Sequence, residues 1–461
     1  MACQLLVTQL VEILPATPIN LSDEAASTLF TGITTDTRSL KPGNVFLALR
    51  GEKFDGHDFA GVAVERGAIA VITDRRAPTQ LNGIPQLQVE DTLLAYQQIA
   101  RWWRDQFDIP VIAVTGSVGK TTTKELIAAV LSTKGNVLKT QANYNNEIGV
   151  PKTLLELGSE HDYAVIEMAM RGSGQIALLA QIARPTVSVI TNVGTAHIGL
   201  LGSEQAIANA KCELLAEMPA TGVAVLNHDN QRLIKTAATV WQGQTLTYGL
   251  EGGSLLGQLV DPETLEVERM QLPLPLAGRH NALNYLAALG VAKLLQVDWA
   301  PLAKGLAVDL PSGRSQRYEL PNDVVILDET YNAGLESMIA ALQLLAQTPG
   351  KRHIAVLGAM KELGERSPEF HRQVGDTAQK LNLDALLILV SDPEAEAIAH
   401  GADSANAHGV ASLPTECFSN PDTLVRHLQE LVQPGDRLLF KASRSVGLDR
   451  VVNQLRAAIS G

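Results

Sequence analysis

A glycine-rich stretch, "VTGSVGKTTTKE" at 114–125, constrains the fold of this 461-residue chain more than any other feature. The apolar run "IPVIAV" comes before it. Apolar residues follow it at helical spacing, at Leu126, Ile127, Val130 and Leu131. A strand, a glycine loop and a helix in this order surround one anion with backbone N–H groups. The stretch predicts a phosphate-binding loop; a glycine turn with an exposed lysine is the alternative.

The loop carries the side chains that a nucleoside triphosphate needs. Lys120 would bring a positive charge to the β- and γ-phosphates, and the Thr121 hydroxyl is a magnesium ligand. Val114 stands where the usual motif begins with glycine, so the loop is a shortened form. The expected ATP-binding residues here are Thr115, Gly116, Ser117, Val118, Gly119, Lys120, Thr121 and Thr122.

Three side chains further along are candidates of unequal strength. Glu167 ends the strand-like "YAVIE", where open α/β sheets place ligands and where a carboxylate can hold magnesium. From spacing alone, His197 in "TNVGTAHIGLLGS" is a structural or solvent-facing loop residue. Lys211 lies on a helical pattern and would by default be a surface lysine.

The composition excludes several classes of protein. A formal charge of −12 argues against a nucleic-acid partner, which usually needs a basic patch. Three scattered cysteines offer no disulfide framework or zinc cluster, so we expect a reducing compartment and a cytoplasmic protein. No apolar run approaches the roughly 18 residues that a membrane span requires.

The pattern of apolar runs predicts three α/β domains. Residues 1–89 hold short strands around a helical stretch, as a small N-terminal domain. Residues 90–317 alternate helices with β-branched runs typical of a mostly parallel, buried sheet around the P-loop. Residues 318–461 repeat the alternation, as a doubly wound Rossmann-like domain. The segment 312–323 is expected to be the hinge between the last two.

Taken together, the motifs resemble those of the Mur ligase family of peptidoglycan synthesis, over nearly the whole chain. In the first domain the resemblance rests on "TTDTRSLKPGNVFLALRGEKFDGHDF". In the central domain it rests on "TGSVGKTTTKE", "NYNNEIGVPKTLL", "VIEM", "TNVGTAHIGLLGS", "AKCELL" and "LAGRHNALNYLAAL". In the third domain it rests on "LDETYNAGLESM", "VLGAMKELGE" and "FKASRSVGLDRVV".

The resemblance implies an ATP-dependent amide ligase that adds D-alanyl-D-alanine to UDP-N-acetylmuramoyl-tripeptide. The peptide carboxylate would be phosphorylated to an acyl phosphate, and the acceptor amine would displace phosphate through a tetrahedral intermediate. ATP and two magnesium ions would be the cofactors, and a monomer is expected. "NNEIGVP" and "ETYNAGLESM" favour this acceptor over a diamino acid.

The resemblance also assigns roles to residues. Catalytic roles fall on Lys120, Glu167, His197 and Lys211. Magnesium would be held by Thr121, Glu167, His197 and Lys211, the last as a carbamate. The remaining nucleotide contacts would be His280, Asn281, Asn284, Asp328 and Lys361. The UDP substrate would meet Thr35, Asp36, Thr37, Arg38, Asp55, Gly56, His57, Asn143, Tyr144, Asn145, Asn146 and Glu147. The acceptor dipeptide would meet Tyr331 and Asn332.

Alternatives stay open at this point. The chain could be a Mur ligase for a diamino acid, a P-loop kinase or switch ATPase, or a nucleotide-binding protein without catalysis. From the residues alone, Asp36 and Arg38 could form a turn salt bridge, "DGH" a turn before a helix, and Asp328 a helix cap. The departures from the family pattern are Ala169, Gly334 with Leu335, Ala359 and Ala442.

Overall fold

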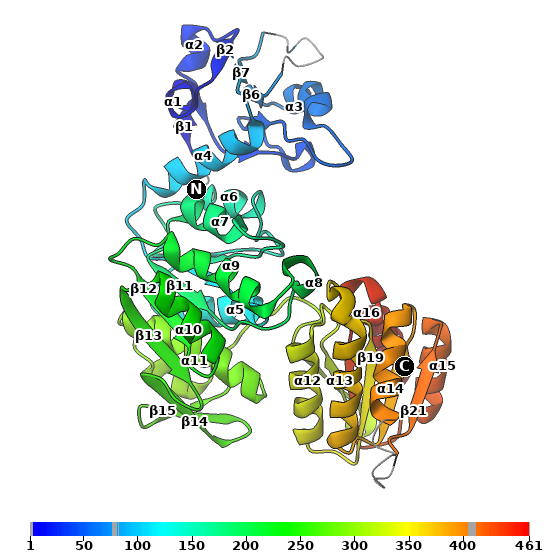
Figure 1. The fold of residues 1–461 in the computed structure, drawn as a ribbon. Helices are drawn as coiled ribbons and strands as arrows, with labels where there is room; N and C mark the ends of the chain where they lie inside the picture. The colour runs from blue at the N-terminus through cyan, green and yellow to red at the C-terminus, as the bar shows by residue number, and fades with distance from the viewer. Residues whose placement is uncertain (1–2, 76–80, 82, 404–411, 461) are drawn as a thin grey trace.

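The computed structural model describes residues 3–75, 81, 83–403 and 412–460 as three α/β bodies along the chain (Figure 1). We call them the first, central and third domains. Their exact boundaries, at 89/90 and 317/318, stay predictions. Within the described residues, no helix is long and apolar enough to cross a membrane.

The first domain is built on a five-stranded sheet in the order β2-β7-β6-β5-β4, with β1 and β3 paired beside it. β5 and β6 are buried at every position, as their apolar runs predicted. The elements are β1 Leu5–Leu6, α1 Val7–Ile13, β2 Thr17–Ile19, α2 Asp23–Ala26, β3 Leu29–Phe30, β4 Ile33–Thr34, β5 Val45–Leu47, α3 Ala60–Glu65, β6 Ala70–Thr73 and β7 Gln86–Gln88.

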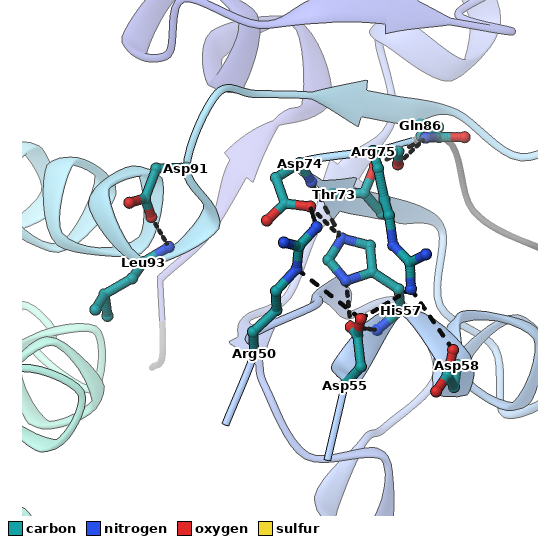
Figure 2. Close-up of polar contacts among 10 residues, drawn as sticks. All are labelled: Arg50, Asp55, His57, Asp58, Thr73, Asp74, Arg75, Gln86, Asp91 and Leu93. Atoms are coloured by element: carbon teal, nitrogen blue, oxygen red, sulfur yellow. Dashed lines mark hydrogen bonds and ion pairs between the residues drawn. The ribbon is translucent and has the colours of Figure 1, made fainter. Parts of the chain in front are cut away.

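Helix α4 (Thr92–Arg104) connects the first domain to the central one. It begins where the side chain of Asp91 accepts hydrogen bonds from the N–H groups of Leu93 (2.7 Å) and Leu94 (3.0 Å). This is a capped helix start, and Figure 2 shows the Asp91–Leu93 contact.

The central sheet has nine strands in the order β16-β15-β14-β13-β12-β11-β8-β10-β9. It is parallel from β9 to β14, whereas β14, β15 and β16 pair antiparallel. The elements are β8 Val111–Thr115, α5 Lys120–Leu131, β9 Val137–Lys139, α6 Gly149–Leu154, β10 Tyr163–Glu167, α7 Gln175–Ala183, β11 Val187–Ile190, α8 Ile198–Leu201, α9 Glu204–Ala216, β12 Val223–Asn227, α10 Gln231–Val240, β13 Gln244–Gly249, β14 Leu255–Asp261, β15 Thr264–Val267, β16 Met270–Pro273 and α11 Arg279–Leu294.

Two hydrophobic cores cover the two faces of this sheet. Ile112 and Val114 of β8 pack into one core with residues of α5 and α11. Val111 and Ala113 face the other core, because successive side chains of a strand point to opposite faces. Burial on both faces explains why the strand reads as an unbroken apolar run.

The third domain has a six-stranded sheet in the order β17-β18-β22-β19-β20-β21. Its elements are β17 Gln316–Leu320, β18 Val324–Asp328, α12 Leu335–Gln347, β19 Arg352–Gly358, α13 Ser367–Lys380, β20 Ala385–Leu389, α14 Glu396–Asp403, β21 Thr415–Phe418, α15 Pro421–Leu431, β22 Asp436–Lys441 and α16 Leu448–Ser460. The hinge predicted at 312–323 is not all linker, because β17 lies within it and pairs antiparallel with β18 along its whole length.

The third domain meets the central domain at the short helix α8 (Figure 1). The N–H of Gly199 donates to the carbonyl of Glu362 at 3.1 Å. A Cβ added to Gly199 would lie 2.5 Å from the nitrogen of Gly364, so two glycines bring the backbones together.

Candidate active site

The phosphate loop connects β8 to α5 at the carboxyl edge of the central sheet, as predicted. Gly116 (φ 153°) and Gly119 (φ 81°) have backbone angles that favour glycine. A Cβ on Gly116 would overlap the hydroxyl of Thr191, and one on Gly119 would lie 2.6 Å from Asn284 Oδ1. The loop therefore needs both glycines for its conformation and for its packing.

The segment after β11 supports this loop, a role that motif reading missed. The Thr191 hydroxyl donates to the carbonyl of Val118 at 2.6 Å. Asn192 Oδ1 accepts from the N–H of Val118 at 3.0 Å, and the N–H of Gly194 donates to Ser117 Oγ at 2.9 Å. The available signal was a polar "TN" pair directly after a buried strand that neighbours the P-loop strand.

Lys120 begins α5 and folds back over the loop. Its Nζ donates to the carbonyls of Gly116 (2.8 Å) and Ser117 (3.4 Å). Burial lowers the pKa of Lys120, while the neighbouring Glu167 acts in the opposite direction. Thr121 follows it, buried in the first turn of the helix. Both residues lie in the first turn of α5, directly after the predicted phosphate loop.

Glu167 ends β10, as predicted, with its carboxylate divided between two environments. Oε1 accepts a hydrogen bond from Asn145 Nδ2 at 2.8 Å. Oε2 is buried and has no hydrogen-bond partner among the described residues. Magnesium prefers carboxylate oxygens, so this buried oxygen fits the magnesium site predicted here.

Lys211 lies on α9, and the default interpretation as a surface lysine is wrong, since it is 2% exposed. Within the described residues, its Nζ has no hydrogen bond or ion pair. Burial, and then the nearby Lys120, lower the pKa of Lys211 well below its ordinary value. The amine is therefore disposed to be uncharged and nucleophilic.

His197 stands just before α8 in a left-handed conformation (φ 65°). Its Nδ1 contacts the carboxylate of Glu362, from the third domain. Burial lowers the pKa of His197, with the charge of Lys120 acting in the same direction. The structure thus brings His197 and Lys211 near Lys120, which spacing alone did not indicate.

Of the other predicted nucleotide contacts, the two asparagines lie against the P-loop helix. Asn284 Oδ1 accepts from the Thr123 hydroxyl at 3.1 Å, and its Nδ2 donates to Asn281 Oδ1 at 3.2 Å. His280, in the same helix turn, is half-buried, and desolvation lowers its pKa.

Asp328 and Lys361 are bonded inside the third domain rather than to the P-loop. Asp328 accepts from the N–H (3.0 Å) and the hydroxyl (2.6 Å) of Thr330, and burial raises its pKa. Lys361 pairs with Asp392. Their contacts with nucleotide stay predictions.

Tyr331 and Asn332 lie among cations that the motif search did not single out. The guanidinium of Arg314 stacks 3.9 Å from the Tyr331 ring centroid, and that of Arg444 lies 5.3 Å away. The buried Lys441 donates to the carbonyl of Asn332 at 2.9 Å. A carboxylate-bearing acceptor would meet favourable charge here.

In the first domain, the residues of "DGH" take part in a cluster of hydrogen bonds and ion pairs around the buried His57 (Figure 2). We call it the His57 cluster. His57 is fully buried, and its ring lies between two carboxylates: Nδ1 is 2.6 Å from Asp55 Oδ1, and Nε2 is 3.1 Å from Asp74 Oδ1 and 3.2 Å from the backbone nitrogen of Asp74. Gly56 has no room for a Cβ, which would lie 2.6 Å from the carbonyl oxygen of Leu49. The turn before a helix is also real, since α3 follows.

Two half-exposed arginines border the His57 cluster. Arg50 bonds Asp74 at 2.6 Å and Arg75 bonds Asp55 at 2.8 Å. Elsewhere in the domain, Asp36 and Arg38 form the turn salt bridge that the residues alone suggested, at 2.7 Å. That pairing lowers the pKa of Asp36. Thr35 and Thr37 flank Asp36 in the same turn.

The loop 143–147 precedes α6 beside Glu167. Besides the Asn145 bond, Asn146 Oδ1 accepts from the N–H of Gly149, the first residue of α6, at 2.9 Å. Lys152 Nζ lies 3.9 Å from the ring centroid of Tyr144. Asn143 and Glu147 complete the loop. Among the departures, Ala359 and Ala442 are fully buried, and Gly334 faces open space.

The loop that carries Lys361 and Glu362 is anchored by a buried histidine. His371 of α13 is fully buried, and its Nε2 accepts from the N–H of Met360 at 2.9 Å. Its Nδ1 donates to the carbonyl of Ser367 at 2.8 Å. Burial lowers the pKa of His371, so the neutral ring that makes both bonds is the form favoured by the fold.

We expect the third domain to lose stability as the pH falls below about 6.5. Below that pH the unfolded chain takes up a proton on His371, whereas burial disfavours the protonated ring in the folded domain. The free energy of unfolding should therefore fall by at most about 1.4 kcal/mol per pH unit. Urea unfolding read by pulsed hydrogen exchange at pH 7.5 and 5.5 measures this. The loss should be smaller in His371→Gln and unchanged in His400→Gln, an exposed control; equal losses in all three would contradict it.

Comparison with known proteins covers most of the chain. Three family models match: the Mur ligase family catalytic domain over residues 29–104, the Mur ligase middle domain over 114–292, and the Mur ligase glutamate ligase domain over 313–444.

Within the described residues, no three His, Cys, Asp or Glu side chains cluster as a metal site.

Individual relatives match over most of their length. A UDP-N-acetylmuramoyl-tripeptide–D-alanyl-D-alanine ligase from Synechocystis sp. is 60% identical, over 95% of this chain and 94% of its own length. The crystal structure of MurF from Acinetobacter baumannii is 31% identical, with a TM-score of 0.88 and 99% of both chains covered. MurF from Thermotoga maritima in complex with ADP is 32% identical, with a TM-score of 0.82 over 95% of this chain and 99% of that one.

Proposed function

The chain belongs to the Mur ligase family, and we propose that it joins D-alanyl-D-alanine to UDP-N-acetylmuramoyl-tripeptide with the use of ATP. The products are UDP-N-acetylmuramoyl-pentapeptide, ADP and phosphate, in peptidoglycan synthesis. One observation carries this conclusion: ligases of this specificity resemble the chain through all three domains, not through the P-loop alone.

Phosphoryl transfer to the peptide requires two anions to approach each other. We propose that Lys120 and the backbone N–H groups of the loop 116–121 offset the charge of the triphosphate as the peptide carboxylate attacks it. The resulting acyl phosphate is then open to the acceptor amine. Attack on its carbonyl carbon forms a tetrahedral intermediate, which expels phosphate and leaves the amide.

We propose that two magnesium ions bind here, one at Thr121 and Glu167 and the second at His197 and Lys211, the lysine as its carbamate. Two observations fit these ions: among the described residues, the buried Glu167 Oε2 has no donor, and the buried amine of Lys211 has no counterion. An uncharged amine reacts with carbon dioxide, and the N-carboxylate so formed supplies the missing oxygen ligands. Bound magnesium would neutralise charge on the phosphates.

The substrate pockets stay proposals. We assign the UDP part to the first domain, at the turn of Asp36 and at the His57 cluster. The hydrogen bond between Asn145 and Glu167 supports placing the peptidyl end near the P-loop. The acceptor is assigned to Tyr331 and Asn332. A monomeric state also stays a prediction.

Phosphate release from ATP tests the reaction class and the acceptor together. We expect sustained release only when UDP-N-acetylmuramoyl-tripeptide and D-alanyl-D-alanine are both present, with pentapeptide formed in equal amount. Parallel reactions should replace the tripeptide by the dipeptide and the acceptor by a diamino acid. Brisk release with neither substrate, or turnover only in the diamino-acid reaction, would overturn the assignment.

A further inference from the structure

We infer that Glu336 is a positioning residue for the ligation. It lies in the first turn of α12, just after the proposed acceptor residues Tyr331 and Asn332. Its carboxylate reaches the central domain and holds the loop that leads to His197. This inference rests on the proposed function, because it concerns how the acceptor domain sets the loop beside the phosphates.

The contact is a two-point hydrogen bond between domains. Glu336 Oε1 accepts from the backbone N–H of Thr195 at 2.7 Å, and Oε2 accepts from the Thr195 hydroxyl at 3.2 Å. A carboxylate held by two donors has a fixed orientation, and such charge-assisted bonds are stronger than neutral ones. Thr195 itself is buried, with 5% exposed.

Gly194 shows how closely the carboxylate approaches. A Cβ added there would overlap Oε1 of Glu336 and lie 2.5 Å from its Cδ and 3.0 Å from Oε2. These three atoms are the nearest neighbours, and all belong to Glu336. Gly194 is not among the described glycines with positive φ, so its backbone does not require glycine. The missing side chain makes room for Glu336.

The same loop connects Glu336 to the reacting groups. The N–H of Gly194 donates to Ser117 Oγ of the phosphate loop at 2.9 Å, and His197 follows two residues after Thr195. One short segment therefore bonds the P-loop on one side and the acceptor domain on the other. Docking of the third domain, through Glu336, orients this segment.

Four variants test the inference: Glu336→Ala, Glu336→Gln, Gly194→Ala and the double variant Gly194→Ala with Glu336→Ala. We expect Glu336→Ala to lower kcat about tenfold and to change the KM for ATP less than about twofold, because it removes two bonds between protein groups only. Glu336→Gln should stay within about threefold of wild type. Its amide oxygen still accepts from the N–H of Thr195, and the hydroxyl can accept from its amide nitrogen.

Gly194→Ala supplies the decisive comparison. The added methyl group should lower kcat at least about tenfold in the native background and almost not at all beside Glu336→Ala, since the atoms it strikes are gone. Melting temperatures of the wild type, Glu336→Ala, Gly194→Ala and the double variant should show the same non-additivity, and they do not depend on which substrates the enzyme uses. A wild type that makes no pentapeptide would refute the proposed function and leave this thermal cycle readable.

Three results would overturn the inference. Gly194→Ala could be equally harmful in both backgrounds, which would deny the contact. Glu336→Ala could retain the wild-type kcat, which would deny its importance to the reaction. Glu336→Gln could be as inactive as Glu336→Ala, which would mean that the reaction depends on the negative charge of Glu336 rather than on its hydrogen bonds to Thr195.

Discussion

The Lys120→Ala variant is expected to lose at least about a thousandfold in kcat/KM for ATP-dependent ligation. Lys120 is the cation that begins α5, bonded to the carbonyls of the loop in which phosphate would lie. In a site shielded from water, one preorganised charge beside developing negative charge contributes about this much. Steady-state formation of pentapeptide and ADP measures the loss.

The loss should not come from unfolding. Burial already lowers the pKa of Lys120, so its removal takes away a desolvated amine and should leave the melting temperature unchanged or raised. Lys235→Ala, on an exposed position of α10, is the matched control and should behave as wild type. If the Lys120→Ala protein ligates within about tenfold of wild type, the phosphate loop is not the reaction centre.

Lys211→Ala is expected to lose about a hundredfold or more in kcat, with partial recovery in short carboxylates. The buried amine of Lys211 has no partner within the described residues, and its pKa is lowered strongly. We therefore expect it to act as a carbamate. A small carboxylate such as formate or acetate would fill the space left by alanine and restore the oxygens, by roughly tenfold.

Two comparisons separate this rescue from an effect of salt. Chloride at equal ionic strength should not restore the Lys211→Ala enzyme, and acetate should not restore Lys120→Ala. Wild-type protein exchanged into ¹³C-labelled bicarbonate should show a carbamate carbon signal that Lys211→Ala lacks. Full activity of Lys211→Ala, or equal recovery in chloride, would remove the carbamate from the mechanism.

The parts of the fold that follow from local pattern were predictable. β8, β10, β11 and β12 are almost wholly apolar, apart from Ser188 inside β11 and one polar residue at the end of each of the others, because both faces of the central sheet are covered by helices. Their common direction also places the P-loop and the end of β10 at one edge, which the order of elements implies. The antiparallel strands β14–β16 and the edge strand β17 are partly exposed and mix polar with apolar residues. They were not identified from the spacing of apolar residues in the sequence.

The site residues that could not be predicted from the sequence act through contacts with residues far away in the chain. Nothing in a helical lysine indicates burial, so the state of Lys211 depends on packing around α9. Thr191 and Asn192 bond a loop more than seventy residues earlier in the chain. The reason for Gly194 is a side chain from another domain. Such facts belong to tertiary structure, and periodicity carries no record of them.

The glycine pair at α8 limits which substitutions this contact between the domains can accept. Gly199 and Gly364 approach so closely that neither tolerates a side chain. A methyl group at either position would have to part the two backbones and disturb the hydrogen bond from the N–H of Gly199 to the carbonyl of Glu362. The contact therefore constrains the sequence through its backbone, and a single added carbon at either glycine would weaken the joint between the domains.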